Sequence, residues 1–293
     1  MTRSGLVSVV GRPNVGKSTL VNALVGEKVS ITSDRPQTTR NTIRGVLTLE
    51  AEDAQIVFVD TPGLHKPRTA LGERLNKLVY GSLEDTDLTL FVVAADQPIG
   101  PGDRLIAERL ETSKSEVVVA VNKIDKSKPH QIAEQLAEAS AWDMAAYVPV
   151  SALLGDGLDP LRDELLQRLQ EGPFWFPKEM RSDQPDALLA AERIREKYLS
   201  RMRNELPHSL AVVVEDITPR ENGTLYILAK VYVERDSQKG IVIGKGGSVL
   251  RAVGEEARPE LESFFGTKVF LELRVKVERD WQRREQLLDR LGF

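Results

Sequence analysis

The sequence has 293 residues, 41% of them hydrophobic and 29% charged, and a formal net charge of −4. A chain of this length is expected to form about two domains. It contains no cysteine, which excludes disulfides and zinc–thiolate sites and suits a reducing compartment. No apolar run approaches the ~18 residues of a membrane-spanning helix. The three histidines are too scattered along the sequence to predict a metal site.

The first informative segment is GRPNVGKS at residues 11–18, which fits the phosphate-binding pattern G-x-x-x-x-G-K-[ST]. An apolar run at residues 6–10 predicts a buried strand before it, and residues 18–24 predict a helix after it. Glycines let the backbone turn tightly, so that its N–H groups and the helix N-terminus face phosphate oxygens. We expect Lys17 to reach the outer phosphates and the Ser18 hydroxyl to bind Mg²⁺. The predicted nucleotide contacts of this loop are Gly11, Arg12, Pro13, Asn14, Val15, Gly16, Lys17 and Ser18.

The motif DTPG at residues 60–63 follows a second apolar run, residues 55–59, which predicts another buried strand. A carboxylate at a strand end near the phosphate loop can hold the shell of a Mg²⁺ ion through water. The Gly63 N–H is expected to bond a terminal phosphate and to lose that bond after hydrolysis. Asp-x-Pro-Gly is also an ordinary turn sequence, so its weight comes from its position in the chain. The predicted contacts are Asp60, Thr61, Pro62, Gly63 and Leu64.

The motif NKID at residues 122–125 follows a third predicted strand, residues 117–121. The Asp125 carboxylate can accept hydrogen bonds from both the N1–H and the exocyclic amine of guanine, and adenine offers no such pair of donors. We expect the Lys123 stem to cover the base and Asn122 to tie this loop to the phosphate loop. After a further strand, a backbone N–H at Ser-Ala is expected to meet the guanine carbonyl. The predicted base-side residues are Asn122, Lys123, Ile124, Asp125, Ser151 and Ala152.

The polar segment at residues 30–41, SITSDRPQTTRN, lacks apolar periodicity and is predicted to be a mobile loop. A threonine here can close over Mg²⁺ and the terminal phosphate. We choose Thr39 and keep Thr38 as the alternative; a solvated loop without a ligand role is the other interpretation. The predicted metal-binding residues are therefore Ser18, Thr39 and Asp60.

Residues 173–185 are rich in proline and are predicted to be a linker. After it, residues 186–204 have the spacing of an amphipathic helix. Three predicted strands follow at residues 210–217, 224–234 and 267–278, and residues 280–291 are expected to be helical. This half has 20 Lys and Arg against 19 Asp and Glu over residues 180–293, so its charge alone does not predict nucleic-acid binding.

Between the second and third of these strands lies IGKGG, at residues 243–247, where two short helices are predicted to meet at a glycine turn. This order of elements resembles a KH domain of the prokaryotic type over residues 185–280. A GxxG turn lets an RNA backbone pass close to two helix ends, whose N–H groups meet its phosphates. Arg274 is expected to extend the charge of this surface. The predicted RNA-binding residues are Lys239, Ile241, Ile243, Gly244, Lys245, Gly246, Gly247 and Arg251.

Five segments of the first half, GRPNVGKS, QTTRN, DTPGL, NKID and VSA, resemble the Era-type GTPases within the P-loop GTPases. The resemblance covers residues 5–170 and implies an α/β fold. A P-loop GTPase domain over residues 1–172, with a mostly parallel sheet and helices on both faces, would be followed by an α+β type II KH domain with a C-terminal helix over residues 186–293. It also implies GTP and GDP binding with Mg²⁺ and hydrolysis of GTP to GDP and phosphate.

The resemblance further implies which partners the chain has and where it works. It implies binding to 16S ribosomal RNA near its 3′ end, a role in biogenesis of the small ribosomal subunit, and no DNA partner. The expected protein is a cytoplasmic monomer with peripheral association with the cell membrane. GTP and Mg²⁺ are expected to order residues 30–41 and 60–68 and so to change how the KH domain presents its groove.

The catalytic residues implied by the resemblance are Lys17, Thr39, Gly63 and Asn14. Leu64 stands where Ras-like proteins have the glutamine that orients water, and it cannot perform that task. His65 is next in the sequence, although a single loop histidine is more often a surface residue. Asn14 occupies the position at which related GTPases hold a potassium ion, which supplies positive charge. A different class stays open: a non-enzymatic nucleotide-binding module whose second domain binds protein partners.

Overall fold

The structure is a computed structural model. It describes residues 2–35, 38–64, 67, 69–84, 86–202, 206 and 209–293, with the side chain of residue 84 also outside the description. Some predicted positions therefore lie outside the described residues. They are residue 37 of the QTTRN motif, residue 65 after Leu64, and residues 203–204 at the end of the helix predicted over residues 186–204. The chain forms two compact units, Met1–Pro67 with Gly72–Asp183, and Gln184–Phe293 with Arg68–Leu71. The domain limits predicted from the sequence stay a prediction.

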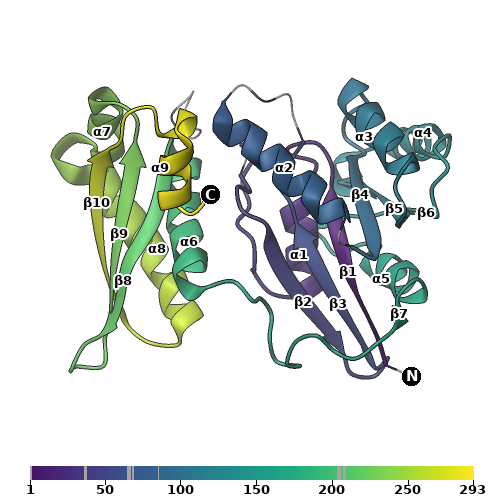
Figure 1. Ribbon diagram of the computed structural model, residues 1–293, viewed down its shortest axis with the longest axis horizontal. Coiled ribbons are helices and arrows are strands. Elements are labelled where there is room, and N and C mark those ends of the chain that lie inside the picture. The colour runs from purple at the N-terminus through teal and green to yellow at the C-terminus, as the bar shows by residue number, and fades with distance from the viewer. Residues whose placement is uncertain are drawn as a thin grey trace. The chain divides into compact units, whose positions relative to one another are not determined.

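The first unit contains a seven-stranded sheet, of which six strands lie in the order β2-β3-β1-β4-β5-β6 (Figure 1). Five strands are parallel: β1 (Arg3–Val10), β3 (Ala54–Asp60), β4 (Leu88–Ala94), β5 (Glu116–Asn122) and β6 (Ala146–Pro149). The edge strand β2 (Ile43–Leu49) is antiparallel to β3, and the short β7 (Gln170–Glu171) pairs antiparallel with the start of β1. Strands β3 and β4 are buried along their whole length, which explains their nearly continuous apolar sequences.

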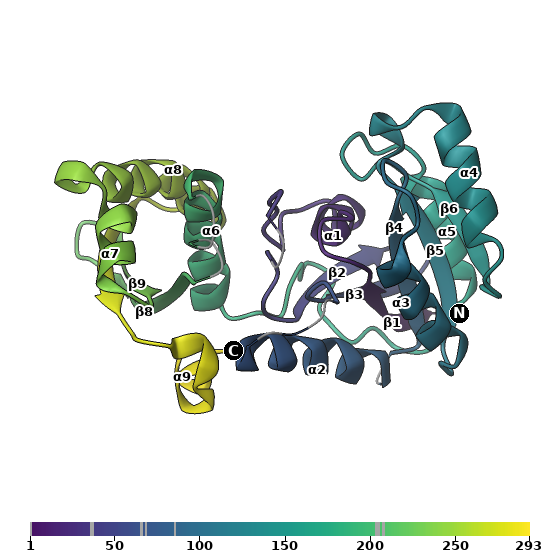
Figure 2. The same ribbon diagram turned by 90° about the horizontal axis from the view of Figure 1, so that it is seen from above.

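Helices cover both faces of this sheet (Figure 2). One face packs against α1 (Lys17–Val25) and α5 (Leu158–Gln167), in a core that includes Leu20 and Leu161. The other packs against α2 (Ala70–Glu84), α3 (Pro101–Glu111) and α4 (Pro129–Ala139). Because the central strands are parallel, the loops after β1, β3, β5 and β6 leave the same edge of the sheet. The fold thus gathers the predicted nucleotide motifs from four distant parts of the sequence.

Residues 173–183 belong to the first unit and are hydrogen-bonded to its strands. The buried Gln55 side chain accepts hydrogen bonds from the N–H groups of Trp175 and Phe176, at 2.9 and 3.0 Å. Its amide donates to the Phe176 carbonyl at 2.9 Å and to the Thr48 hydroxyl at 3.0 Å. Further along, the Val46 N–H donates to the Arg181 carbonyl at 2.8 Å. A single glutamine on β3 therefore satisfies most of the polar backbone groups at Trp175 and Phe176.

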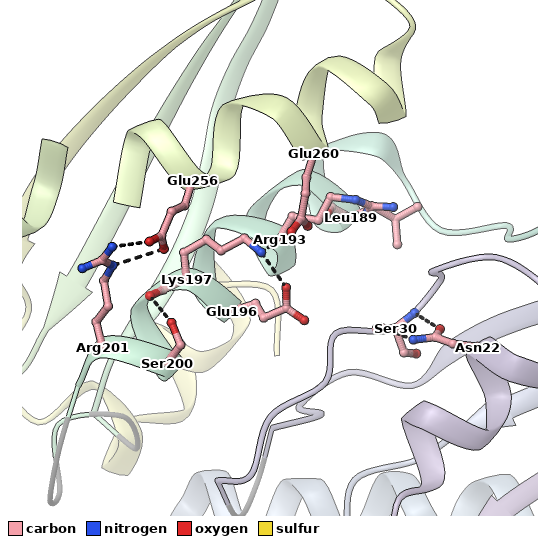
Figure 3. Close-up of polar contacts among 10 residues, drawn as sticks. All are labelled: Asn22, Ser30, Leu189, Arg193, Glu196, Lys197, Ser200, Arg201, Glu256 and Glu260. Atoms are coloured by element: carbon pink, nitrogen blue, oxygen red, sulfur yellow. Dashed lines mark hydrogen bonds and ion pairs between the residues drawn. The ribbon is translucent and has the colours of Figure 1, made fainter. Parts of the chain in front are cut away.

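The second unit has the element order predicted from its sequence. Helix α6 (Asp186–Arg201) precedes β8 (Ala211–Pro219) and β9 (Leu225–Val233), and α7 (Asp236–Ile243), α8 (Ser248–Phe265) and β10 (Val269–Val277) follow. The sheet order is β10-β9-β8, with β10 parallel to β9 and β8 antiparallel to it. Ile194 of α6 and Leu261 of α8 share one core with the strands. Ion pairs join the outer sides of the two helices, Lys197 with Glu260 and Arg201 with Glu256 (Figure 3).

The end of the chain differs from the single helix expected over residues 280–291. A short 3₁₀ turn, Trp281–Arg283, is separated by an extended Arg284 from α9 (Glu285–Arg290). The break arises because Trp281 is fully buried, donates from its indole Nε1 to the Ser209 carbonyl at 3.1 Å, and stacks on Phe293. Over the described part of the chain, no helix is both long and apolar enough to cross a membrane.

Gln55→Ala is expected to lower the free energy of unfolding of the first unit by about 1–3 kcal/mol, because backbone groups of Trp175 and Phe176 lose their partners. Urea unfolding followed by circular dichroism measures this change. Thr48→Val, which removes only the hydroxyl contact of the same glutamine, is the control and should have a smaller effect. An unchanged midpoint in Gln55→Ala would show that the side chain does not hold this segment.

Candidate nucleotide and RNA sites

The phosphate loop of the structure needs glycine at two positions. Gly11 has φ 151° and Gly16 has φ 97°, which side chains rarely adopt. A Cβ atom at Gly11 would lie 2.4 Å from the Val92 carbonyl oxygen, and one at Gly16 would lie 2.3 Å from Asn122 Nδ2. The loop is therefore pressed against β4 on one side and the NKID motif on the other.

Lys17 lies inside this loop and is buried. Its Nζ donates to the carbonyl oxygens of Gly11 and Arg12, at 3.1 and 2.9 Å. Burial lowers the pKa of Lys17 to about 8, against the opposing charge of Asp60. The two carbonyl oxygens are neutral acceptors. A nucleotide phosphate would give the ammonium group an anionic partner within hydrogen-bonding distance.

Three predicted metal-binding residues come together at the start of α1. The hydroxyls of Ser18 and Thr39 are 2.9 Å apart, and Asp60 lies fully buried beside them. Burial raises the pKa of Asp60, while the hydroxyls of Ser18, Ser30 and Thr39 and the charge of Lys17 lower it. Among the described residues, neither carboxylate oxygen has a hydrogen-bond partner of regular geometry.

These groups fit Mg²⁺, because hydroxyl and carboxylate oxygens are the hard ligands it prefers and a buried carboxylate without a regular partner needs a cation. The alternative residue, Thr38, donates its hydroxyl to the Arg35 carbonyl at 2.7 Å. Of the two threonines, Thr39 is thus the one whose hydroxyl lies beside that of Ser18.

The remaining residues of the DTPG segment lie in different environments. The Thr61 hydroxyl donates to the Val9 carbonyl at 2.7 Å and so holds the loop to β1. Gly63 lies against Pro13, where a Cβ atom would be 2.7 Å from the proline nitrogen, and it lines the phosphate end of the site. Leu64 packs on the hydrophobic core below α2, α3 and α4. Among these three, Gly63 is the one with access to a phosphate.

On the base side, Asn122 joins three loops. Its amide nitrogen donates to the Val15 carbonyl at 2.9 Å, and its amide oxygen accepts from the Ala152 N–H at 3.0 Å. Asp125 is exposed, and one of its oxygens accepts from the Ser151 hydroxyl at 2.7 Å, which fixes the carboxylate. Lys123 adopts a left-handed backbone conformation, φ 68°, and its Nζ lies 3.4 Å from Asp96. Ile124 packs on the core.

These loops surround an open cavity of about 600 Å³, lined by Asn122, Lys123, Asp125 and Ala152 on one side and Asn14 and Gly16 on the other. Its size falls in the range of small-molecule sites. A smaller cavity of about 50 Å³ adjoins it and reaches Lys17, Ser18, Thr39 and Gly63. The two share lining residues and together give a base end and a phosphate end.

Sequence reasoning missed several residues at this cavity. Thr19, Thr32, Ser33, Asp34 and Gln97 line it as well. The Asn14 amide donates to the Asp34 carbonyl at 2.9 Å, which links the phosphate loop to the polar loop. The only sequence signal for the residues of the polar loop is its lack of periodicity. Arg12 is a predicted contact whose side chain points elsewhere: its Nε donates to buried Asp103 at the start of α3, at 2.7 Å.

The GxxG turn of the second unit is open. Gly244, Gly246 and Gly247 have φ of 75°, 60° and 78°. A Cβ at Gly244 would lie 2.7 Å from Val249 Cγ2, whereas no atom of the described residues lies within 4 Å of one at Gly246 or Gly247. Exposed charges and an apolar side chain surround the turn, namely Lys245, Arg251 and Ile241, the last 57% exposed.

Two other predicted residues of this surface, Lys239 and Ile243, are partly buried. Arg274 forms an ion pair with Glu272 at 2.7 Å on β10. This pair partly neutralises the positive charge that Arg274 would present to RNA.

The family model described as a 50S ribosome-binding GTPase matches residues 6–123, and the KH domain model matches residues 205–282. GTPase Era of Mycobacterium tuberculosis (strain ATCC 25618 / H37Rv) is 52% identical over 297 aligned residues, which cover 99% of this chain and 98% of that protein. The chain belongs to the GTPase Era family. Its predicted family and fold class are thereby confirmed, and as a member of this family it is a GTPase.

Two solved structures of Era resemble this chain along its whole length. Era in complex with MgGDPNP and nucleotides 1506–1542 of 16S ribosomal RNA has a TM-score of 0.96 and 40% sequence identity, with 100% of this chain and 99% of that chain covered. A variant of Aquifex aeolicus Era bound to GDP·AlF4⁻ has a TM-score of 0.94 and 39% identity, with 99% of each chain covered. The Era fold therefore spans both units of the chain.

Gly16→Ala is expected to weaken GTP binding by about 100-fold or more, because the added Cβ would collide with Asn122 and the positive φ would be strained. Fluorescence titration with a labelled GTP measures this loss, with ATP as competitor to confirm the preference for guanine. Gly26→Ala is the matched control, since Gly26 ends the same helix at φ 79° with nothing within 4 Å of its Cβ. Equal binding by both variants would contradict the close fit at Gly16.

Proposed function

We propose that this Era-family GTPase is a nucleotide-driven switch that binds 16S ribosomal RNA near its 3′ end and assists assembly of the small ribosomal subunit. The observation that carries the proposal is that one chain holds both a phosphate-and-base cavity, formed by the nucleotide motifs, and an open GxxG turn. The Era structure with 40% identity, which contains both a GTP analogue and nucleotides 1506–1542 of 16S RNA, supports it.

Each nucleotide contact has a separate task. Asp125, held by Ser151, accepts from the two donors of guanine and so selects GTP over ATP. Lys17 and the loop N–H groups bind phosphate oxygens, and the Gly63 N–H bonds the terminal phosphate. Ser18, Thr39 and Asp60 would hold Mg²⁺, which neutralises charge on the phosphates when bound.

Loss of the terminal phosphate of GTP is the step that reverses the switch. When the terminal phosphate leaves, the Gly63 N–H loses its partner, and Thr39 loses the site that holds residues 38–41 against α1. These residues and 60–64 then relax. In the proposed switch, this relaxation also changes how the KH unit presents its RNA-binding groove.

Hydrolysis in this chain proceeds without the glutamine of Ras-like proteins. Leu64 is packed on the core and carries no polar atom that could orient water. Positive charge near the transition state is therefore proposed to come from K⁺ held by Asn14, which lines both the phosphate and the base ends of the cavity.

RNA binding is proposed to use the open face of the GxxG turn. Gly246 and Gly247 leave room for the sugar–phosphate backbone, and Lys245 adds a positive charge beside it. Bases would lie against the exposed Ile241. The family resemblance further suggests a monomer of the cytoplasm with peripheral association with the cell membrane and no DNA partner, and these points stay predictions.

Gly246→Asp is expected to weaken binding of a small-subunit RNA 3′ fragment by about tenfold, because a carboxylate would face the phosphates. Gel shifts measure the affinity. Gly223→Asp is the matched control, since Gly223 also has positive φ and open space around its Cβ but lies in the β8–β9 turn. Equal losses in both variants would count against the turn as the RNA site. The same gel shifts, repeated with GDPNP and with GDP bound, test the switch. Equal affinities for the RNA in the two nucleotide states would contradict the proposed coupling.

Turnover of GTP is expected to be faster in K⁺ than in Na⁺ by about tenfold or more, because bound K⁺ would stabilise the charge of the transition state. Asn14→Ala should abolish this difference. Phosphate release measured with malachite green in matched K⁺ and Na⁺ buffers provides the test. The K⁺ hypothesis fails if the unsubstituted chain hydrolyses GTP equally fast in both.

A further inference from the structure

Another cavity of the first unit, of about 380 Å³, is formed by residues that belong to none of the nucleotide motifs. The sheet forms one side of it, through Leu6 of β1, Arg44 of β2 and Val59 of β3, and α2 forms the other. Figure 2 shows α2 running along one face of the sheet. Among the described residues, none lines both this cavity and the nucleotide cavity. Its volume falls in the range of small-molecule sites.

The side of the cavity formed by α2 contains a glycine that packing does not require. The lining residues of this helix follow the spacing of one helical face, namely Arg74, Lys77, Leu78, Gly81 and Ser82. A Cβ atom at Gly81 would have no atom of the described residues within 4 Å. Glycine is an unfavourable residue inside a helix, and here no close contact explains it. Its lack of a side chain leaves space in the cavity.

Apolar and basic side chains are combined in the lining. Leu6, Val59 and Leu78 supply apolar surface, and Arg44 pairs with Val59 across β2 and β3, so that these two residues lie on the same face of the sheet. Of the ten described residues that line the cavity, none is acidic and three are basic, namely Arg44, Arg74 and Lys77. In a chain whose net charge is −4, this is a local excess of positive charge.

Two acidic residues bond to lining residues without lining the cavity themselves. Asp183 forms an ion pair with Arg44 at 2.6 Å, and Asp87 accepts a hydrogen bond from the Leu6 N–H at 2.8 Å. The charge of Arg44 is therefore partly neutralised. Lys77 is exposed, and among the described residues it has no ion-pair partner. Lys77 is thus the cation that is best placed to pair with a bound anion.

We propose that this cavity is a second ligand site, separate from the nucleotide cavity, for a small amphipathic anion. Such a ligand has an apolar chain or ring that carries a phosphate or carboxylate group. Its apolar part contacts Leu6, Val59 and Leu78 and removes their surface from water, while its anionic group pairs with Lys77. Val59 directly precedes Asp60, so the ligand lies beside the segment that is proposed to relax after hydrolysis.

The test uses octyl phosphate, which combines an apolar chain with an anionic group, and isothermal titration calorimetry of the full chain in excess GDP. Inorganic phosphate, which has the charge alone, and octyl glucoside, which has the chain alone, are the reference probes. Octyl phosphate should bind at a single site and at least about tenfold more tightly than either reference. Equal affinity for octyl phosphate and one of the references overturns the inference. Binding that excess GDP abolishes belongs to the nucleotide cavity and overturns it as well.

Lys77→Glu tests the charge of the site. It should weaken binding of octyl phosphate by about tenfold or more, because a cation beside the anionic group becomes an anion. Lys114→Glu is the matched control, since Lys114 is also exposed and has no ion-pair partner among the described residues, but lies in the turn before β5. Equal losses of affinity in the two variants, or no loss in Lys77→Glu, would overturn the inference.

Gly81→Leu tests the space in the cavity. The leucine side chain should abolish binding of octyl phosphate by occupying part of the cavity, and leucine suits a helix better than glycine does. Gly240→Leu is the matched control, since Gly240 is an exposed glycine of α7 that also has no atom of the described residues within 4 Å of its Cβ. Binding that is unchanged in Gly81→Leu, or lost equally in both variants, contradicts the proposed site.

Discussion

Burial of the Asp60 carboxylate, without a regular hydrogen bond to any described residue, is the constraint on which the proposed nucleotide site depends. Removing a carboxylate from water costs several kcal/mol when nothing compensates it. Lys17, the nearby cation, is itself buried and bonded to two backbone carbonyls. Neither charge can relieve the other fully, because both lose hydration. In the proposed function, bound Mg²⁺ and phosphates would offset this cost, and their binding would then be linked to the order of the loop around Thr39.

The base end depends on a different kind of contact, one that joins loops through uncharged groups. Asn122 connects the phosphate loop to residues after β6, and Gly16 is closed against its amide. Ser151 then orients Asp125 from the last of these loops. The proposed contacts to guanine and to phosphate therefore share one frame of hydrogen-bonded loops. In the proposed switch, the loop around Thr39 and the segment after Asp60 would be the parts that respond to the terminal phosphate.

The sequence predicted the parts of the site that depend on local pattern. Apolar runs marked β1, β3 and β5, and the Gly-Lys-Ser and Asn-Lys-Ile-Asp motifs follow them directly. It could not predict contacts made by distant residues of ordinary type. Asn22 holding Ser30 and Gln55 holding Trp175 involve residues without motif or periodicity, since their partners are set by packing. The break at Arg284 was missed for the same reason, because burial of Trp281 overrides the helical pattern.

The two glycine-rich turns show how the same residue type serves ligands of different size. Gly16 is crowded, with a side-chain amide where its Cβ would be, so the loop encloses a small ligand and rejects any extra atom. Gly246 and Gly247 face open space, so a polymer can enter and leave without a change in the turn. A tightly packed loop can be sensitive to a single phosphate, whereas an open turn leaves room for a long chain. In the proposed function, the two turns would therefore have separate tasks, one in sensing the nucleotide state and the other in binding RNA.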